Sequence, residues 1–104
     1  MALPENETRL DAAALERLLA SGAWRREGQA ITRTFTFKGF NGAMAFANRV
    51  AQAANEANHH PDIHIERYKT VRIVLTTHAT GGISDADVEL ARRIDELENA
   101  TRPP

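Results

Sequence analysis

The sequence predicts one α+β domain, a four-stranded antiparallel sheet with helices packed on one face, in the order α-β-β-α-β-β-α. Two segments with alternating or β-branched apolar residues are each interrupted by a short turn, as in β-hairpins. Three other segments repeat apolar residues every three or four positions, as amphipathic helices do. The strands of each pair lie too close in the sequence for a parallel crossover, which favours hairpins. A chain of 104 residues suits a single domain spanning residues 1–104.

A short helix is expected first. Asp11 can act as its N-cap, because a carboxylate accepts hydrogen bonds from the free N–H groups of a first turn. Ser21-Gly22 supplies the stop. The residues before it, 1–10, are expected to form a flexible arm or an extended lead-in. The apolar residues at helical spacing are Ala14, Leu15, Leu18 and Leu19.

A first hairpin is expected next. Its strands, 24–26 and 30–37, are separated by a turn centred on Gly28. In the second strand apolar and aromatic residues alternate with threonines, so they share one face. Arg33 is the exception, because it stands at one of the otherwise apolar positions.

The longest helix is expected from Phe40 onward. Its apolar residues form a stripe wider than a single contact with a sheet requires, and its many alanines allow another helix to approach closely. This surplus of apolar surface indicates an oligomer. The stripe comprises Phe40, Ala43, Met44, Ala47, Val50, Ala51 and Ala54, and it is widened by Phe46, Ala53 and Ala57.

Pro61 ends this helical pattern, and a second hairpin is expected beyond it. Its apolar residues alternate, while His64 faces the other way and is expected to be solvated. A last helix is expected near Ser84, where Asp87 three positions later completes a capping signature. The tail, 101–104, is expected to be flexible. The inward residues of the hairpin are Ile63, Ile65, Val71, Ile73 and Leu75.

The composition excludes several classes of function. The formal net charge is −1 with both signs spread along the chain, and no basic run or basic–aromatic patch points to nucleic acid. No apolar stretch is long enough to cross a membrane, and residues 1–7 lack the features of a signal peptide. A cytoplasmic protein is therefore expected. The absence of cysteine excludes disulfides, thiolate nucleophiles and cysteine-based zinc sites.

Three of the four histidines fall in two groups, at 58–61 (NHHP) and at 76–78 (TTH). The hairpin between the groups has a length that can bring the second group back beside the first. Imidazole, with an ordinary pKa of about 6.5, can both give and take a proton near neutral pH. Both groups are expected at the ends of elements rather than in the core, where functional side chains are commonly displayed. Asp87, near the positive end of the last helix, could orient a nearby imidazole.

Each feature also has a structural interpretation. A histidine pair at a helix end is more often a surface or capping pair than a catalytic one, and the aspartate early in the last helix is explained by capping alone. A metal site built from the four histidines is a further alternative, but no cysteine or carboxylate completes a tight ligand spacing. A binding or dimerisation module without catalysis is the remaining one.

These residues together resemble the pterin-4a-carbinolamine dehydratases, also called 4a-hydroxytetrahydrobiopterin dehydratases. The resemblance rests on fixed residue types at fixed spacings over positions 59–87, and the element order extends it over nearly the whole chain. The matching residues are His59-His60-Pro61, Tyr68, His78, Gly81-Gly82-Ile83-Ser84 and Asp87, with Trp24, Phe35-Thr36-Phe37-Lys38 and Phe40-Asn41 as earlier matches.

The resemblance implies an activity. The substrate would be a tetrahydropterin that carries a hydroxyl group at carbon 4a, as formed when aromatic amino acid hydroxylases use the pterin as reductant. Loss of water would give the quinonoid dihydropterin, which a reductase can recycle. The reaction would require no metal and no organic cofactor. The resemblance also implies a homodimer through sheet edges or a homotetramer through helices.

The resemblance also implies roles for individual residues. His59 and His78 would form the proton-transfer pair, since one group must protonate the leaving hydroxide and another must take the proton of the ring nitrogen. His60 would bind the substrate or assist the transfer. Which of the pair is the acid is left open by the sequence. The residues expected to bind substrate are His60, Asp87, Asn58 and Thr77.

The chain departs from the family pattern around the first histidine group. Four residues before His59, where members commonly carry an ionisable residue, it has Asn55, and Asn58 stands where many have aspartate. Ile63 replaces a tryptophan of the animal members, and the hairpin around Tyr68 is one residue longer than theirs. Animal members also serve as dimerisation cofactors of a transcription factor, so a non-catalytic pterin-binding or dimerisation role is the alternative function.

Overall fold

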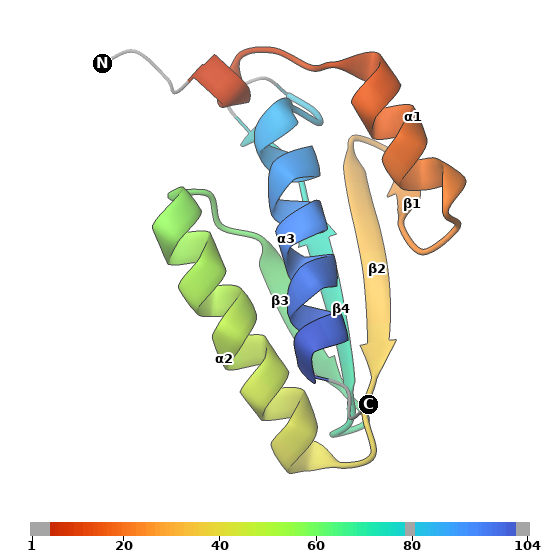
Figure 1. The fold of residues 1–104 in the computed structure, drawn as a ribbon, viewed down its shortest axis with the longest axis vertical. Coiled ribbons are helices and arrows are strands. Elements are labelled where there is room, and N and C mark those ends of the chain that lie inside the picture. The colour runs from red at the N-terminus through yellow and green to blue at the C-terminus, as the bar shows by residue number, and fades with distance from the viewer. Residues whose placement is uncertain (1–4, 79–80, 102–104) are drawn as a thin grey trace.

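The computed structural model describes residues 5–78 and 81–101, and it confirms the predicted α+β fold and element order. Helices α2 and α3 lie across one face of the sheet, and α1 lies beside the first turns of α3, near strands β1 and β2 (Figure 1). A short 3-10 helix, η1, precedes α1. The elements are η1 (Glu5–Glu7), α1 (Ala12–Ala20), β1 (Arg25–Glu27), β2 (Ala30–Thr36), α2 (Phe40–Ala57), β3 (Asp62–Glu66), β4 (Thr70–Leu75) and α3 (Asp85–Thr101).

The four strands are antiparallel and lie in the order β1-β2-β4-β3. The two hairpins therefore join through their second strands, which become the central pair of the sheet. The register places Ile31 opposite Leu75 and Ile63 opposite Ile73, so the inward residues of neighbouring strands share one face. This join brings the end of β4, which leads to the second histidine group, to the middle of the sheet.

The core lies between this face and the helices. Phe35 of β2 packs against Phe46 of α2, with ring centroids 4.7 Å apart, and against Trp24 at 6.4 Å. Phe40, the first residue of the predicted apolar stripe, is 53% exposed and belongs to the surplus apolar surface predicted for α2. As the first residue of the helix, Phe40 contributes no burial to the core, whereas Phe46 two turns later is fully buried. The buried residues of α2 are Ala43, Phe46, Ala47, Val50, Ala53 and Ala54.

Arg33, the charged residue among apolar positions of β2, is neutralised by α3. Its guanidinium group contacts Asp95 at 2.5 Å and Glu98 at 3.3 Å, and it lies 4.4 Å from the centre of the Phe35 ring. Asp95 also accepts a hydrogen bond from the indole N–H of Trp24 at 2.9 Å. Arg33 therefore fits the predicted alternation of side chains in β2. The aliphatic part of its side chain lies at the edge of the core, while its charged group is paired with carboxylates of α3.

The segment before α1 is not extended, which corrects part of the expectation for residues 1–10. Glu5–Glu7 form the 3-10 helix η1, and the side chain of Asn6 donates a hydrogen bond to Glu89 of α3 at 2.8 Å. Asp11 caps α1 as predicted, through the backbone N–H groups of its first turn. Residues 1–4 and 102–104 lie outside the described part of the chain, and the flexibility predicted at both ends stays a prediction.

Within residues 5–78 and 81–101, every helix is too short or too polar to cross a bilayer.

Candidate active site

The first histidine group begins where α2 ends. Asn58 adopts the left-handed conformation, with φ 51° and ψ 41°, and its N–H bonds to the carbonyl groups of the last helical turn. Asparagine tolerates this conformation better than most residues, which gives a structural reason for its presence here. The N–H of His59 also returns to the carbonyl of Ala54, at 3.1 Å. The chain then turns away, so His59 is buried while His60 is exposed.

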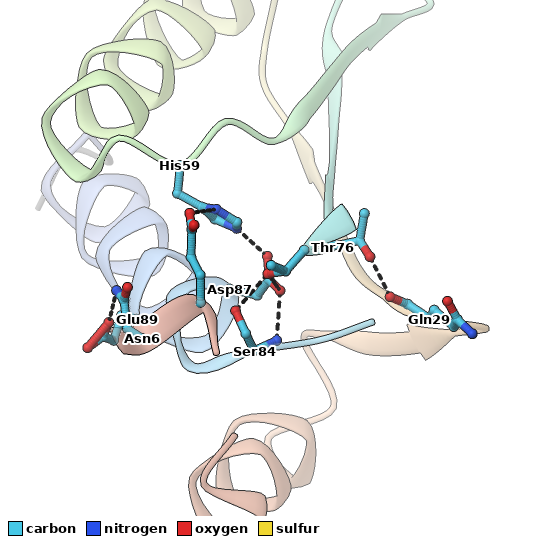
Figure 2. Close-up of polar contacts among 9 residues, drawn as sticks. Asn6, Gln29, His59, Thr76, Ser84, Asp87 and Glu89 are labelled. Atoms are coloured by element: carbon cyan, nitrogen blue, oxygen red, sulfur yellow. Dashed lines mark hydrogen bonds and ion pairs between the residues drawn. The ribbon is translucent and has the colours of Figure 1, made fainter. Parts of the chain in front are cut away.

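His59 lies between two carboxylates that come from opposite ends of the sequence (Figure 2). Its Nε2 atom is 2.6 Å from Oδ1 of Asp87, and its Nδ1 atom is 3.1 Å from Oε1 of Glu7. The hydrogen bond with Asp87, and then its charge and the contact with Glu7, raise the pKa of His59 above 6.5, although burial opposes the rise. The imidazolium form of His59 therefore persists to higher pH than that of an ordinary histidine.

The burial of His59 corrects the expectation that this histidine would lie outside the core. The side chain is only 8% exposed. It remains close to an element end, as predicted, but the turn η1 and the first turns of α3 cover it. Removing His59 should therefore affect the fold as well as the chemistry.

Asp87 connects the two histidine groups. Its side chain is fully buried, and its second oxygen, Oδ2, accepts from the Thr77 hydroxyl at 2.7 Å and from the backbone N–H of Ser84 at 3.0 Å. The bond from Ser84 is the predicted capping contact, and the positive end of α3 stabilises the carboxylate. Asp87 also orients His59, as the sequence suggested. Capping alone is thus an incomplete explanation of this residue.

His78 directly follows Thr77, and its side chain is exposed. Just before it, Thr76 donates a hydrogen bond to the carbonyl of Gln29 at 2.6 Å (Figure 2). Thr77 forms an antiparallel bridge with Gly82. The Gly81 N–H bonds to the His78 carbonyl at 3.1 Å. Through Asp87, His59 is linked to Thr77, the residue before His78.

The remaining two histidines differ in their surroundings. Nε2 of His60 is 3.0 Å from the side-chain oxygen of Asn55, so Asn55 orients His60 rather than His59. His64 stands within β3 opposite Arg72, away from the contacts around Asp87. Among the described residues, no group of three or more His, Cys, Asp or Glu side chains is arranged to hold a metal ion.

A small cavity of about 170 Å³ opens beside His59, between η1, the end of α2 and α3. Asn6 and Glu7 hold η1 beside this cavity through contacts with Glu89 and His59, and neither was predicted as a site residue from the sequence. The segment around them has no periodic pattern. Its contacts are with residues far away in the sequence, so no local signal marks a functional residue. The cavity is lined by Asn6, Ala57, His59, Ala86, Glu89, Leu90 and Arg93.

A family model described as pterin 4 alpha carbinolamine dehydratase matches residues 8–97. The chain belongs to this family. Its similarity to curated dehydratase-family proteins extends over most of both chains. A relative from Thermomicrobium roseum, provisionally named pterin-4-alpha-carbinolamine dehydratase, is 53% identical over 90 residues, which cover 86% of this chain and 96% of the relative. One from Sulfurisphaera tokodaii with the same name is 48% identical, over 79% of this chain and 87% of the relative.

Solved structures of the dehydratase family support the same fold. The crystal structure of a transcriptional coactivator/pterin dehydratase from Brucella melitensis has a TM-score of 0.76 and 30% identity, and the match covers 86% of this chain and 98% of that one. A pterin dehydratase-like protein described as a RuBisCO assembly factor in the alpha-carboxysome has a TM-score of 0.58 and 24% identity, over 71% of this chain and 84% of that one, and shows the fold alone.

Membership in the dehydratase family makes this chain an enzyme of the hydro-lyase class. The matched region contains both histidine groups and Asp87, whereas Glu7 lies just before it. The second carboxylate on His59 therefore comes from outside the matched region.

Proposed function

We propose that the chain removes water from 4a-hydroxytetrahydrobiopterin, the pterin-4a-carbinolamine, and releases the quinonoid dihydropterin. The observation that carries the proposal is the pair of contacts that favours His59 in its imidazolium form, in a chain of the dehydratase family. The reaction needs an acid at neutral pH, and a histidine whose pKa is raised supplies one. No metal or organic cofactor enters the proposed reaction.

The acid protonates the hydroxyl at carbon 4a, and the C4a–O bond breaks with its electron pair leaving on the oxygen as water. The neighbouring ring nitrogen stabilises the cation at C4a. A base then removes the proton from that nitrogen, which completes the quinonoid product. One proton is donated and one is taken, so the enzyme returns to its starting charge after the two histidines re-equilibrate.

We assign the acid to His59 and the base to His78. Asp87 holds the Nε2 side of His59 at 2.6 Å, and the proton to be transferred is the one on Nδ1, where the contact with Glu7 is longer, at 3.1 Å. The hydroxyl of the substrate would share this N–H with Glu7. The side chain of His78 is exposed on the neighbouring loop, from which it would reach the ring nitrogen of the pterin. In this proposal His60 and Asn58 bind the substrate, whereas the buried Asp87 and Thr77, which the sequence also assigned to substrate binding, act by positioning His59.

Purified protein is expected to accelerate the dehydration of a synthetic 4a-hydroxytetrahydropterin, which ultraviolet absorbance follows directly. The control is the same protein after heat denaturation, because buffer and free imidazole also promote the reaction slowly. A rate equal to that of buffer, with folded protein, would contradict the proposed reaction. It would instead favour the non-catalytic pterin-binding or dimerisation role.

We propose further that the enzyme acts in the cytoplasm, in recycling of tetrahydrobiopterin used by an aromatic amino acid hydroxylase. The support is chemical: such a hydroxylase produces the carbinolamine, and a reductase consumes the quinonoid product. Deletion of the gene in its host should raise the carbinolamine and its rearranged pterins only when a hydroxylase is active.

We also propose that the chain forms a homodimer or homotetramer. Large apolar side chains remain exposed on one protomer, among them Phe40 at the start of α2 and Tyr68 in the second hairpin, which are 53% and 59% exposed. Light scattering at micromolar concentration should give the mass of a dimer or tetramer, and Phe40→Ser should lower it. Leu10→Ser is the matched control, because Leu10 is also exposed but lies before α1. A monomeric mass for the unchanged protein would contradict the proposal.

A further inference from the structure

The second carboxylate that contacts His59 belongs to η1, a segment without a buried residue. Glu7 is the last residue of η1, and its side chain is 15% exposed beside a histidine ring that is itself buried. The contact joins residues 52 positions apart, at 3.1 Å between Glu7 Oε1 and His59 Nδ1. A carboxylate at this distance can accept a hydrogen bond from a protonated Nδ1 and also neutralise part of the ring's charge.

The segment that carries Glu7 is fixed on α3, the same helix that carries Asp87. The Thr8 hydroxyl bonds to the Glu5 carbonyl at 2.8 Å and closes the turn, and Asn6 is hydrogen-bonded to Glu89. After the turn, the N–H of Asp85 bonds to the Arg9 carbonyl at 2.9 Å. The two carboxylates that flank His59 are thus held by one rigid element, although they stand at opposite ends of the sequence.

The cluster around His59 consists of its imidazole and the carboxylates of Glu7 and Asp87. With both carboxylates ionised and His59 protonated, the cluster carries one net negative charge. Asp87 alone would neutralise the imidazolium, and its second oxygen is already bound to Thr77 and Ser84. Glu7 is therefore not needed to pair a buried charge. Its placement is explained by control over the Nδ1 side of the ring, the side that Asp87 does not reach.

We propose that Glu7 is a positioning residue of the dehydratase, which holds the Nδ1–H of His59 and thereby keeps the ring doubly protonated and in one orientation. The inference rests on the proposed role of His59 as the acid. It predicts that the charge of Glu7, rather than its bulk, matters. Glu7→Gln keeps the size of the side chain and an acceptor oxygen, but it removes the charge.

The loss of this charge should lower the pKa of His59, because a nearby carboxylate favours the imidazolium form. Since the imidazolium is the proposed acid, the alkaline limb of the kcat profile should move to lower pH. At pH 8 we expect kcat to fall by roughly three- to tenfold, well below the 10²–10⁴-fold expected for loss of an acid itself. At pH 6 the variant should approach the unchanged enzyme.

The experiment measures the titration of His59 by nuclear magnetic resonance of the imidazole nitrogens, together with the kcat–pH profile. Glu5→Gln is the matched control, since Glu5 lies in the same turn but is exposed and pairs with Arg9. We expect His59 to titrate at lower pH in Glu7→Gln than in the unchanged protein and in Glu5→Gln. Equal titration of His59 in all three proteins would overturn the inference.

The titration separates this inference from the proposed function. If the unchanged protein fails to dehydrate the pterin, the proposed function fails, but the titration still decides whether Glu7 controls His59. A second measurement covers a Glu7→Gln variant that does not fold. In the unchanged protein the Nδ1 proton of His59 should show a nuclear Overhauser contact to the Glu7 side chain, and the lack of that contact would overturn the inference.

Discussion

Replacing His78 with alanine is expected to lower kcat by roughly 10²–10⁴-fold, the range for a positioned acid or base. The melting temperature should be almost unchanged, because the His78 side chain is exposed. A loss of rate without a loss of stability distinguishes a proton-transfer group from a structural one. The measurements are steady-state kinetics with the pterin substrate and thermal unfolding followed by circular dichroism.

His59→Ala should give a similar loss of rate but a different stability. It removes the imidazole partner of the fully buried Asp87, so we expect the melting temperature to fall by more than about 5 °C. His64→Ala is the control for removal of an imidazole, because His64 lies within β3 away from Asp87. Its rate and melting temperature should both stay near those of the unchanged protein.

Two outcomes would contradict this interpretation. An unchanged rate in both His78→Ala and His59→Ala would overturn their assignment as the proton-transfer pair. A loss of rate that a chelator reproduces in the unchanged protein, and that added zinc restores, would show that the histidines hold a metal instead.

Local patterns were sufficient to predict the fold. Helices and strands have short periods, so the apolar residues of α1 and α2 and the alternation in β2 and β4 could be read within a few turns of sequence. Caps are local too, which is why Asp11 and Asp87 were both found. Periodicity gave the apolar face of α2 but not which of its residues the sheet covers, and Phe40, at the start of the helix, is among those left exposed.

The site could be predicted only in part, for a related reason. The two histidine groups were visible because each is a compact motif, and Asp87 was visible because it also caps a helix. Glu7 was missed because its role depends on a contact across 52 positions, from a segment without a repeating pattern. The burial of His59 was missed for the same reason, since the cover over its ring includes the turn that carries Glu7.

The fold should depend strongly on Asp87. In Asp87→Ala, His59, Thr77 and the Ser84 N–H all lose a buried partner, so we expect a loss of about 3–5 kcal/mol in the free energy of unfolding, as for other broken buried pairs. Asp87→Asn is the matched variant. It keeps the size and an acceptor oxygen, so it should lose less stability, while removing the charge that favours the imidazolium.

The pH dependence of that loss identifies the ion pair. The pKa of His59 is raised in the folded protein, so protonation of this ring stabilises the fold fully below its ordinary value of about 6.5 and progressively less as the pH rises through the raised value. In Asp87→Asn the main cause of the raised pKa is gone. The difference in stability between the unchanged protein and Asp87→Asn should therefore be largest near pH 6 and should shrink toward pH 9. Urea unfolding at both pH values measures it. An equal difference at both would mean that Asp87 supports the fold through its hydrogen bonds to Thr77 and Ser84 alone, and that the charge on His59 is not held by this carboxylate.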